Sequence, residues 1–154
     1  MDAAERAELI RQYRDGYAEV KAALDGITDE ELDRSDEDGW TPRQVVQHLA
    51  DAEIIGASRA RLLLAHPQPV IQGYDQELFM ETLVYDRPLE PYLETMRWAR
   101  ETTGSLLGKL SEKDWSRAGM HTERGRYTTE DWLRMYAPHA HEHAAQIRRA
   151  RGKK

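Results

Sequence analysis

The stretch Trp40-Thr-Pro-Arg-Gln-Val-Val-Gln-His48 carries the clearest secondary-structure signal in the chain. Thr41 is a favoured N-cap residue, Pro42 suits the first helical position, and Gln44 completes a capping box. These residues predict a helix from Thr41 to about Ala65, which two following prolines end. The apolar face of this helix includes a histidine. It is formed by Val45, His48, Leu49, Ala52 and Ile55.

Three other segments are predicted to be long helices. Residues 2 to about 25 place apolar side chains three or four positions apart, and Gly26 then ends the helix. A second segment runs roughly from Leu89 to Leu110. The third begins at Thr128, a good N-cap, and continues to about Arg151.

The segments between these helices carry weaker signals. A short helix is expected around residues 75–82, whereas residues 27–39 and 111–127 are expected to be loops, and no strand pattern stands out. Four long helices and one minor helix in 154 residues predict an all-α four-helix bundle. We expect one domain over residues 1–154, with the short extra helix between the second and third helices of the bundle.

Composition narrows the classes of function. The formal charge of −6 argues against a nucleic-acid partner, because such proteins usually carry a basic face. The basic tail, formed by Arg148, Arg149, Arg151, Lys153 and Lys154, is better explained by the favourable position of cations at a helix C-terminus. No cysteine is present, so any thiol chemistry needs a thiol from a small molecule, and a metal would need imidazole or oxygen ligands.

The sequence shows no sign of export or of membrane insertion. Its N-terminus is acidic and lacks the apolar segment of a signal peptide, and no apolar stretch approaches the ~20 residues that a transmembrane helix needs. We therefore expect a cytoplasmic protein without a membrane partner.

Three of the six histidines form a candidate metal site. His139 and His143 are four positions apart, so they lie one turn apart on the inward face of the last helix. If the helix that carries His48 packs beside this one, three imidazoles converge and leave coordination positions open for water or substrate. His141 lies on another side of the helix and should point elsewhere. The alternative is that the histidines are ordinary core and surface residues.

Two outer motifs and two inner segments resemble the DinB-like superfamily. The first motif runs from Trp40 to Glu53, and the last is Tyr136-Ala-Pro-His139-Ala-His-Glu-His143-Ala-Ala-Gln146-Ile147. Between them, Gly73-Tyr74-Asp75 and His121-Thr-Glu-Arg-Gly125 resemble further segments of the family in the same order. The similarity covers most of the chain.

This resemblance implies an up-down-down-up bundle, often a homodimer, with one divalent metal ion such as nickel or zinc held by His48, His139 and His143. Family members often carry a second histidine where this chain has Glu142, and this glutamate is a candidate to orient His143. The better understood members resemble transferases that join low-molecular-weight thiols, such as bacillithiol or mycothiol, to small electrophiles. Others are described as metal-dependent hydrolases or as stress-induced proteins.

The residues of the sequence are compatible with three functions. The first is a metal-dependent thiol transferase, for which Glu53, Tyr74, Asp75 and Tyr136 are candidates to orient substrate or to move protons, although a structural role explains each of them better. The second is a hydrolase with metal-bound hydroxide as the nucleophile. The third is a metal-binding stress protein without turnover.

Overall fold

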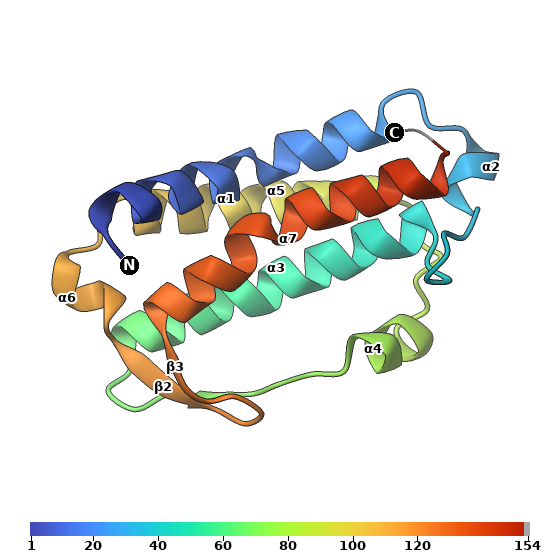
Figure 1. The fold of residues 1–154 in the computed structure, drawn as a ribbon. Coiled ribbons are helices and arrows are strands. Elements are labelled where there is room, and N and C mark those ends of the chain that lie inside the picture. Colours follow the sequence, from blue (N-terminus) through green and yellow to red (C-terminus); the bar gives the residue numbers. More distant parts are fainter. Residues whose placement is uncertain (153–154) are drawn as a thin grey trace.

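Four long helices form the bundle in the computed structural model, which describes residues 1–152. They are α1 (Ala3–Leu24), α3 (Pro42–Ala65), α5 (Glu90–Leu107) and α7 (Thr129–Ala150). α1 packs against α5 and α7, and α3 packs against the same two helices. α1 and α7 run in one direction and α3 and α5 in the other, so the expected up-down-down-up bundle is confirmed (Figure 1).

The helix ends follow the predicted caps. Thr41 and Thr128 each accept a hydrogen bond from the backbone three residues later, and both capping boxes are complete. Gly26, just past the end of α1, has a φ of 61°, which glycine adopts without strain. α7 continues unbroken through Pro138. No helix among the described residues is long and apolar enough to cross a membrane.

The long connection from α3 to α5 exists because these neighbouring helices are parallel. The chain must return along the whole bundle, and it does so through β1 (Val70–Ile71) and α4 (Gln76–Thr82), as Figure 1 shows. α4 is the short extra helix expected between the second and third long helices. Its N-cap is Asp75, whose side chain accepts hydrogen bonds from the backbone of Glu77 and Leu78.

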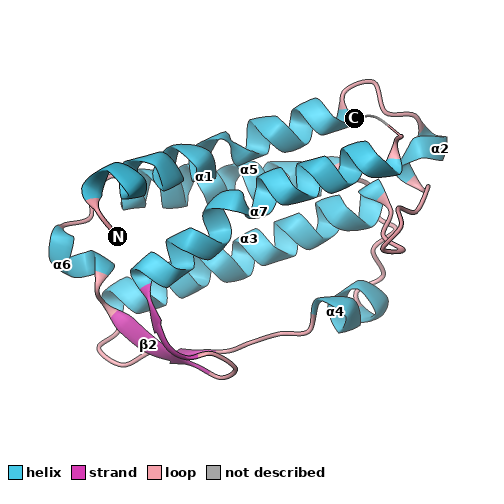
Figure 2. Ribbon diagram, viewed as in Figure 1, coloured by secondary structure: helices cyan, strands magenta, loops and turns pink. Residues whose placement is uncertain are grey.

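Two segments that were expected to be loops contain regular structure. Residues 27–39 include α2 (Asp29–Leu32), which a capping box between Thr28 and Glu31 begins. Residues 111–127 include α6 (Glu112–Trp115) and most of the hairpin formed by β2 (Ala118–His121) and β3 (Gly125–Thr128), drawn in magenta in Figure 2. These elements span only four residues each, too few for a periodic pattern to reveal them.

The hairpin joins β1 in a three-stranded sheet of order β1-β2-β3. β1 pairs with β2 in parallel, with Ile71 opposite His121, and β2 pairs with β3 in antiparallel fashion. The sheet thus fixes the start of the return connection against the hairpin. This contact brings residues near 73 and 122 together, where the backbone N–H of Gly73 donates to the hydroxyl of Thr122 at 2.9 Å.

The core of the bundle consists of two hydrophobic clusters. One contains Val20, Leu49, Met96 and Ile147, and the other contains Tyr13, Leu63, Leu107 and Trp132. Between them along α3 and α5 lie Glu53 and Arg100, which are 0% and 1% exposed and form an ion pair at 2.7 Å.

The arginines of the basic tail form contacts within the chain. Arg148 pairs with Glu19 and Arg149 lies near Glu37 and Asp38. Arg151 is buried and pairs with Glu31. Lys153 and Lys154 lie outside the described residues.

Candidate metal centre

The structure brings together the three histidines that the sequence singled out. His48 projects from α3, and His139 and His143 project from successive turns of α7. One ring nitrogen from each lies within 4.8 Å of the other two. The Nε2 atoms of His139 and His143 are 3.2 Å apart, and the His48 ring centroid lies 4.9 Å from that of His143.

These imidazoles are neutral at neutral pH. Burial, with the nearby His143, lowers the pKa of His48 to about 3. Burial also lowers the pKa of His139 and that of His143. A neutral imidazole keeps one nitrogen with a free lone pair, which is the form that binds a metal.

Gln146 determines which nitrogen of His143 is free. The Nδ1 of His143 donates to the Oε1 of Gln146 at 2.7 Å, so the neutral ring presents its lone pair at Nε2, toward His139. Glu142, the residue considered for this role from the sequence, is exposed and has no hydrogen bond to the ring among the described residues. The orienting residue is therefore one turn further along α7. His141 points away, as expected, with its Nε2 2.9 Å from the Gln12 carbonyl on α1.

The site fits a divalent transition metal. Both ring nitrogens of His48 and the Nδ1 of His139 are shielded from solvent and have no hydrogen-bond partner among the described residues. Unpaired buried polar atoms are costly, and a metal that accepts the lone pair of one His48 nitrogen would relieve part of that cost. Two nitrogens bound at 2.0–2.1 Å to one tetrahedral ion lie about 3.3 Å apart. The 3.2 Å between the Nε2 atoms of His139 and His143 agrees with this spacing.

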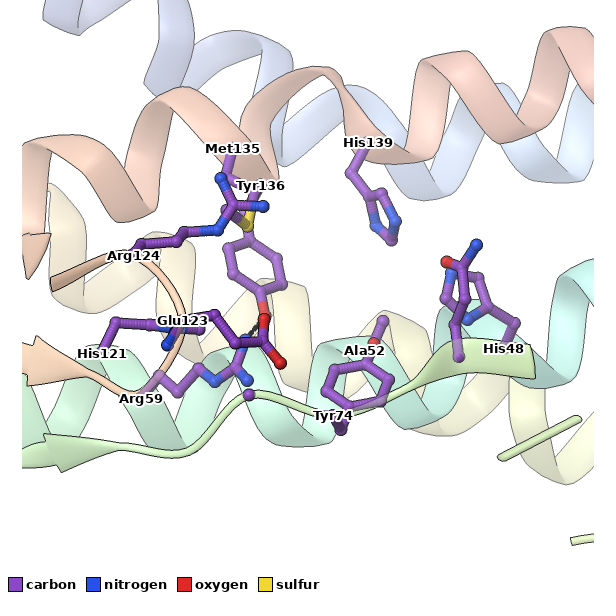
Figure 3. A pocket seen from close by; sticks show the side chains of 12 residues that line it. His48, Ala52, Arg59, Tyr74, His121, Glu123, Arg124, Met135, Tyr136 and His139 are labelled. Carbon is purple, nitrogen blue, oxygen red and sulfur yellow. Dashed lines mark hydrogen bonds between the residues drawn. The ribbon is translucent and has the colours of Figure 1, made fainter. Parts of the chain in front are cut away.

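Two cavities reach the three histidines. The first has a volume of about 300 Å³ and contacts His48 and His139 at one end and Arg59 and His121 at the other (Figure 3). The second has a volume of about 420 Å³ and contacts His48 and His143, with acidic and basic side chains at its rim. The candidate metal centre therefore lies where these two adjoining cavities share His48.

Two tyrosines line the first cavity. Burial raises the pKa of Tyr74 to about 12 and also raises that of Tyr136, so both hydroxyls stay protonated at neutral pH. They can donate a hydrogen bond but cannot act as a base. The Tyr136 ring stacks on Trp132 and lies against Gly56, where a Cβ atom would approach the ring to 2.3 Å. Gly56 is thus required for the position of Tyr136.

The other candidate residues have structural partners. Glu53 accepts hydrogen bonds from the hydroxyl of Tyr13 at 2.9 Å and from the Nε of Arg100 at 2.8 Å, and it does not line either cavity. Asp75 is exposed and caps α4. Of the four candidates named from the sequence, Tyr74 and Tyr136 line a cavity next to the histidines, whereas Glu53 and Asp75 do not.

Sequence reasoning missed several residues of the first cavity. Arg59 lies eleven positions after His48 on α3, which is about three helical turns, so both face the same side. That spacing could have revealed it. Glu123 and Arg124 lie in the turn between β2 and β3. They belong to an inner segment quoted above, but only the sheet shows that this turn reaches the cavity.

Comparisons with known proteins agree with this description. The family model of the DinB superfamily matches residues 12–147. The chain is 33% identical over 141 residues to "Putative metal-dependent hydrolase OB0782" of Oceanobacillus iheyensis, covering 91% of this chain and 82% of that protein. It is also 33% identical over 147 residues to "Putative metal-dependent hydrolase YfiT" of Bacillus subtilis, covering 93% and 82%.

The fold is similar to a solved structure. The structure of YfiT from Bacillus subtilis, described as a probable metal-dependent hydrolase with an unusual four-helix bundle topology, superposes with a TM-score of 0.90. This match has 28% sequence identity and covers 100% of this chain and 91% of that one.

Proposed function

Because this chain belongs to the DinB superfamily, we propose that it is a metal-dependent transferase that joins a low-molecular-weight thiol to a small electrophile. His48, His139 and His143 would hold one divalent ion, such as nickel or zinc. The observation that carries this proposal is the convergence of three neutral imidazoles at the meeting point of two cavities.

The residues of this chain would perform distinct tasks. The three histidines contribute uncharged nitrogen donors, so the charge of a bound ion would stay available to act on a reactant. When bound, a divalent ion acts as a Lewis acid and lowers the pKa of a nucleophile that it coordinates. Gln146 holds His143 in the required tautomer, and Tyr136 and Tyr74 offer hydroxyl protons to the second reactant.

The two cavities favour a reaction with two organic reactants. In thiol transfer, the thiol and the electrophile must approach one centre from different directions, and His48 lines both cavities. The chain has no cysteine that could compete for the electrophile. A hydrolase needs only one organic substrate, because water is its second reactant.

Hydrolysis of an ester or amide is the second candidate, and the names of the relatives favour it. Both reactions use the same three histidines. They differ in whether product formation depends on an added thiol.

The test begins with metal content. We expect untagged protein to bind about one divalent ion per chain, measured by elemental mass spectrometry after incubation with nickel or zinc, and His48→Ala and His143→Ala to lose it while circular dichroism shows a folded protein. His141→Ala is the matched control, because this histidine faces α1 and should leave metal binding unchanged. Wild-type protein that takes up no nickel, zinc or manganese would contradict the proposal.

Metal-loaded protein is then incubated with monochlorobimane or 1-chloro-2,4-dinitrobenzene, with and without a thiol, and with nitrophenyl esters. Thioether product that forms only with thiol and with metal supports the transferase. Ester cleavage that depends on metal and ignores thiol supports the hydrolase. Tight metal binding without any turnover supports a binding protein.

A further inference from the structure

Arg59 is a buried cation without a carboxylate partner. It is 7% exposed, and no carboxylate among the described residues lies within ion-pair distance of it. The other buried arginines differ: Arg6 pairs with Glu112 and Glu130, Arg100 with Glu53, and Arg151 with Glu31. An unpaired buried charge is costly, so the packing of the fold alone does not explain why Arg59 is buried without a carboxylate partner.

The neutral contacts of Arg59 satisfy only part of its guanidinium. One Nη donates to the hydroxyl of Tyr136 at 3.3 Å, and the other donates to the carbonyl of Gln72. The guanidinium carbon lies 5.5 Å from the centre of the Tyr74 ring. The Nε has no hydrogen-bond partner within the described part of the chain. Of five N–H donors, several are therefore left for a ligand.

Arg59 lies at the opposite end of the first cavity from the histidines. Figure 3 shows Arg59 beside Tyr136, with His48 and His139 further along the same cavity. Tyr136 lies between these two ends, and its hydroxyl proton is not donated to any described residue. Glu123 and Arg124 also line this cavity, but both side chains are exposed, so water screens their opposite charges. The interior charge of this cavity is therefore that of Arg59.

We propose that Arg59 and the Tyr136 hydroxyl bind a carboxylate of the substrate, so that the reactive carbon of the same molecule extends toward His48 and His139. A planar guanidinium matches a carboxylate through parallel hydrogen bonds. A single buried cation balances one negative charge, so it favours a monoanion over a dianion such as phosphate. The substrate class is thus a small monocarboxylate. This inference rests on the proposed function, because it treats the cavity as the substrate site.

The test measures binding to metal-free protein, so that turnover plays no part in the readout. Benzoate and benzamide have the same shape and differ in charge, and both are titrated by NMR. We expect wild type to bind benzoate about tenfold or more tightly than benzamide, because hydrogen bonds to a charged partner are worth that much. Arg59→Gln should abolish the preference for benzoate without weakening benzamide. Arg61→Gln is the matched control, since Arg61 contacts Thr102 and Thr103 outside the cavity.

Three results would overturn the inference: equal affinity of wild type for benzoate and benzamide, an unchanged preference in Arg59→Gln, or an equal loss in Arg61→Gln. If Arg59→Gln does not fold, the wild-type titration decides. Benzoate, and not benzamide, must then shift the amide signals of Gln72 and Gly73, which border Arg59, and shifts elsewhere would refute the site. A protein that passes this test but binds no metal would contradict the proposed function alone.

Discussion

At the scale of single residues, the candidate centre depends on which imidazole nitrogens keep their lone pairs. Burial makes the three rings neutral, but neutrality by itself leaves two tautomers for each ring. For His143 the choice is made by one amide oxygen, that of Gln146. A residue that never contacts the ion can thus govern its affinity.

The first prediction concerns this amide. Gln146→Leu should weaken zinc binding about 10- to 100-fold, because the His143 ring loses the partner that fixes its tautomer and orientation. Competition with a chromogenic zinc chelator measures the change. Glu142→Gln is the control, since Glu142 is exposed and has no hydrogen bond to His143. Equal affinities of Gln146→Leu and wild type would show that Gln146 has no orienting role.

At the scale of elements, the start of α7 connects the sheet to the metal-binding helix. β3 ends at Thr128, and the same residue is the N-cap of α7. The hydroxyl and the backbone N–H of Thr128 donate to the carboxylate of Asp131 at 2.6 and 2.8 Å, and Asp131 N–H donates back at 3.1 Å. This reciprocal box sets where α7 begins and therefore where His139 and His143 lie.

The second prediction follows from the charge of Asp131. Burial opposes ionisation, but the hydrogen bonds from Thr128 outweigh it and lower the pKa of Asp131 from its ordinary value. Its ionised form therefore stabilises the fold above about pH 4, and that stability is lost as the pH falls through the lowered pKa. Asp131→Asn should cost about 0.3–1 kcal/mol at pH 7, because this exposed carboxylate near the helix N-terminus is partly screened, and progressively less below pH 4, measured by urea unfolding.

Asp15→Asn is the control for this prediction, because Asp15 is exposed in the middle of α1. It should change stability little at any pH. A deficit for Asp131→Asn that is equally large at pH 7 and in strong acid would argue against the ionised cap.

At the scale of the whole molecule, the buried ion pair between Arg100 and Glu53 joins the long helices about halfway along the bundle. Arg100 on α5 contacts Glu53 on α3 and the carbonyls of Tyr13 and Tyr136 on α1 and α7. One side chain thus links all four helices between the two hydrophobic clusters. Gly16 makes this possible, since a Cβ there would come within 2.2 Å of the guanidinium.

The third prediction tests this link. Arg100→Met should destabilise the fold by about 3–5 kcal/mol, because it leaves Glu53 charged or protonated in an apolar layer without its partner. Urea unfolding gives the free energy. The double variant Glu53→Leu/Arg100→Met should regain part of the loss, since it leaves neither charge of this pair without its partner. A double variant less stable than Arg100→Met would show that the ion pair is not the reason for the loss.

The sequence by itself determined the helices and their caps. Thr41, Pro42 and Gln44 act within one turn, and apolar spacing extends over many residues, so these signals can be recognised without tertiary structure. The spacing of His139 and His143 likewise follows from helix geometry alone. The strands and the four-residue helices gave no comparable signal, because Ala118 to His121 lacks the alternating pattern of a strand and four residues show no helical period.

Only the tertiary structure decided which polar residues meet. The local sequence around Glu53 does not reveal whether its carboxylate contacts a substrate or another side chain. The packing of α3 on α5 places it against Arg100. The spacing from His48 places Arg59 on the same face of α3, but only the structure shows that it has no carboxylate partner among residues 1–152. The cavity also needs the return connection and the hairpin turn, which the sheet brings to α3 and α7 from distant parts of the chain. Contacts between segments far apart depend on the relative placement of whole elements, and local patterns carry no record of that placement.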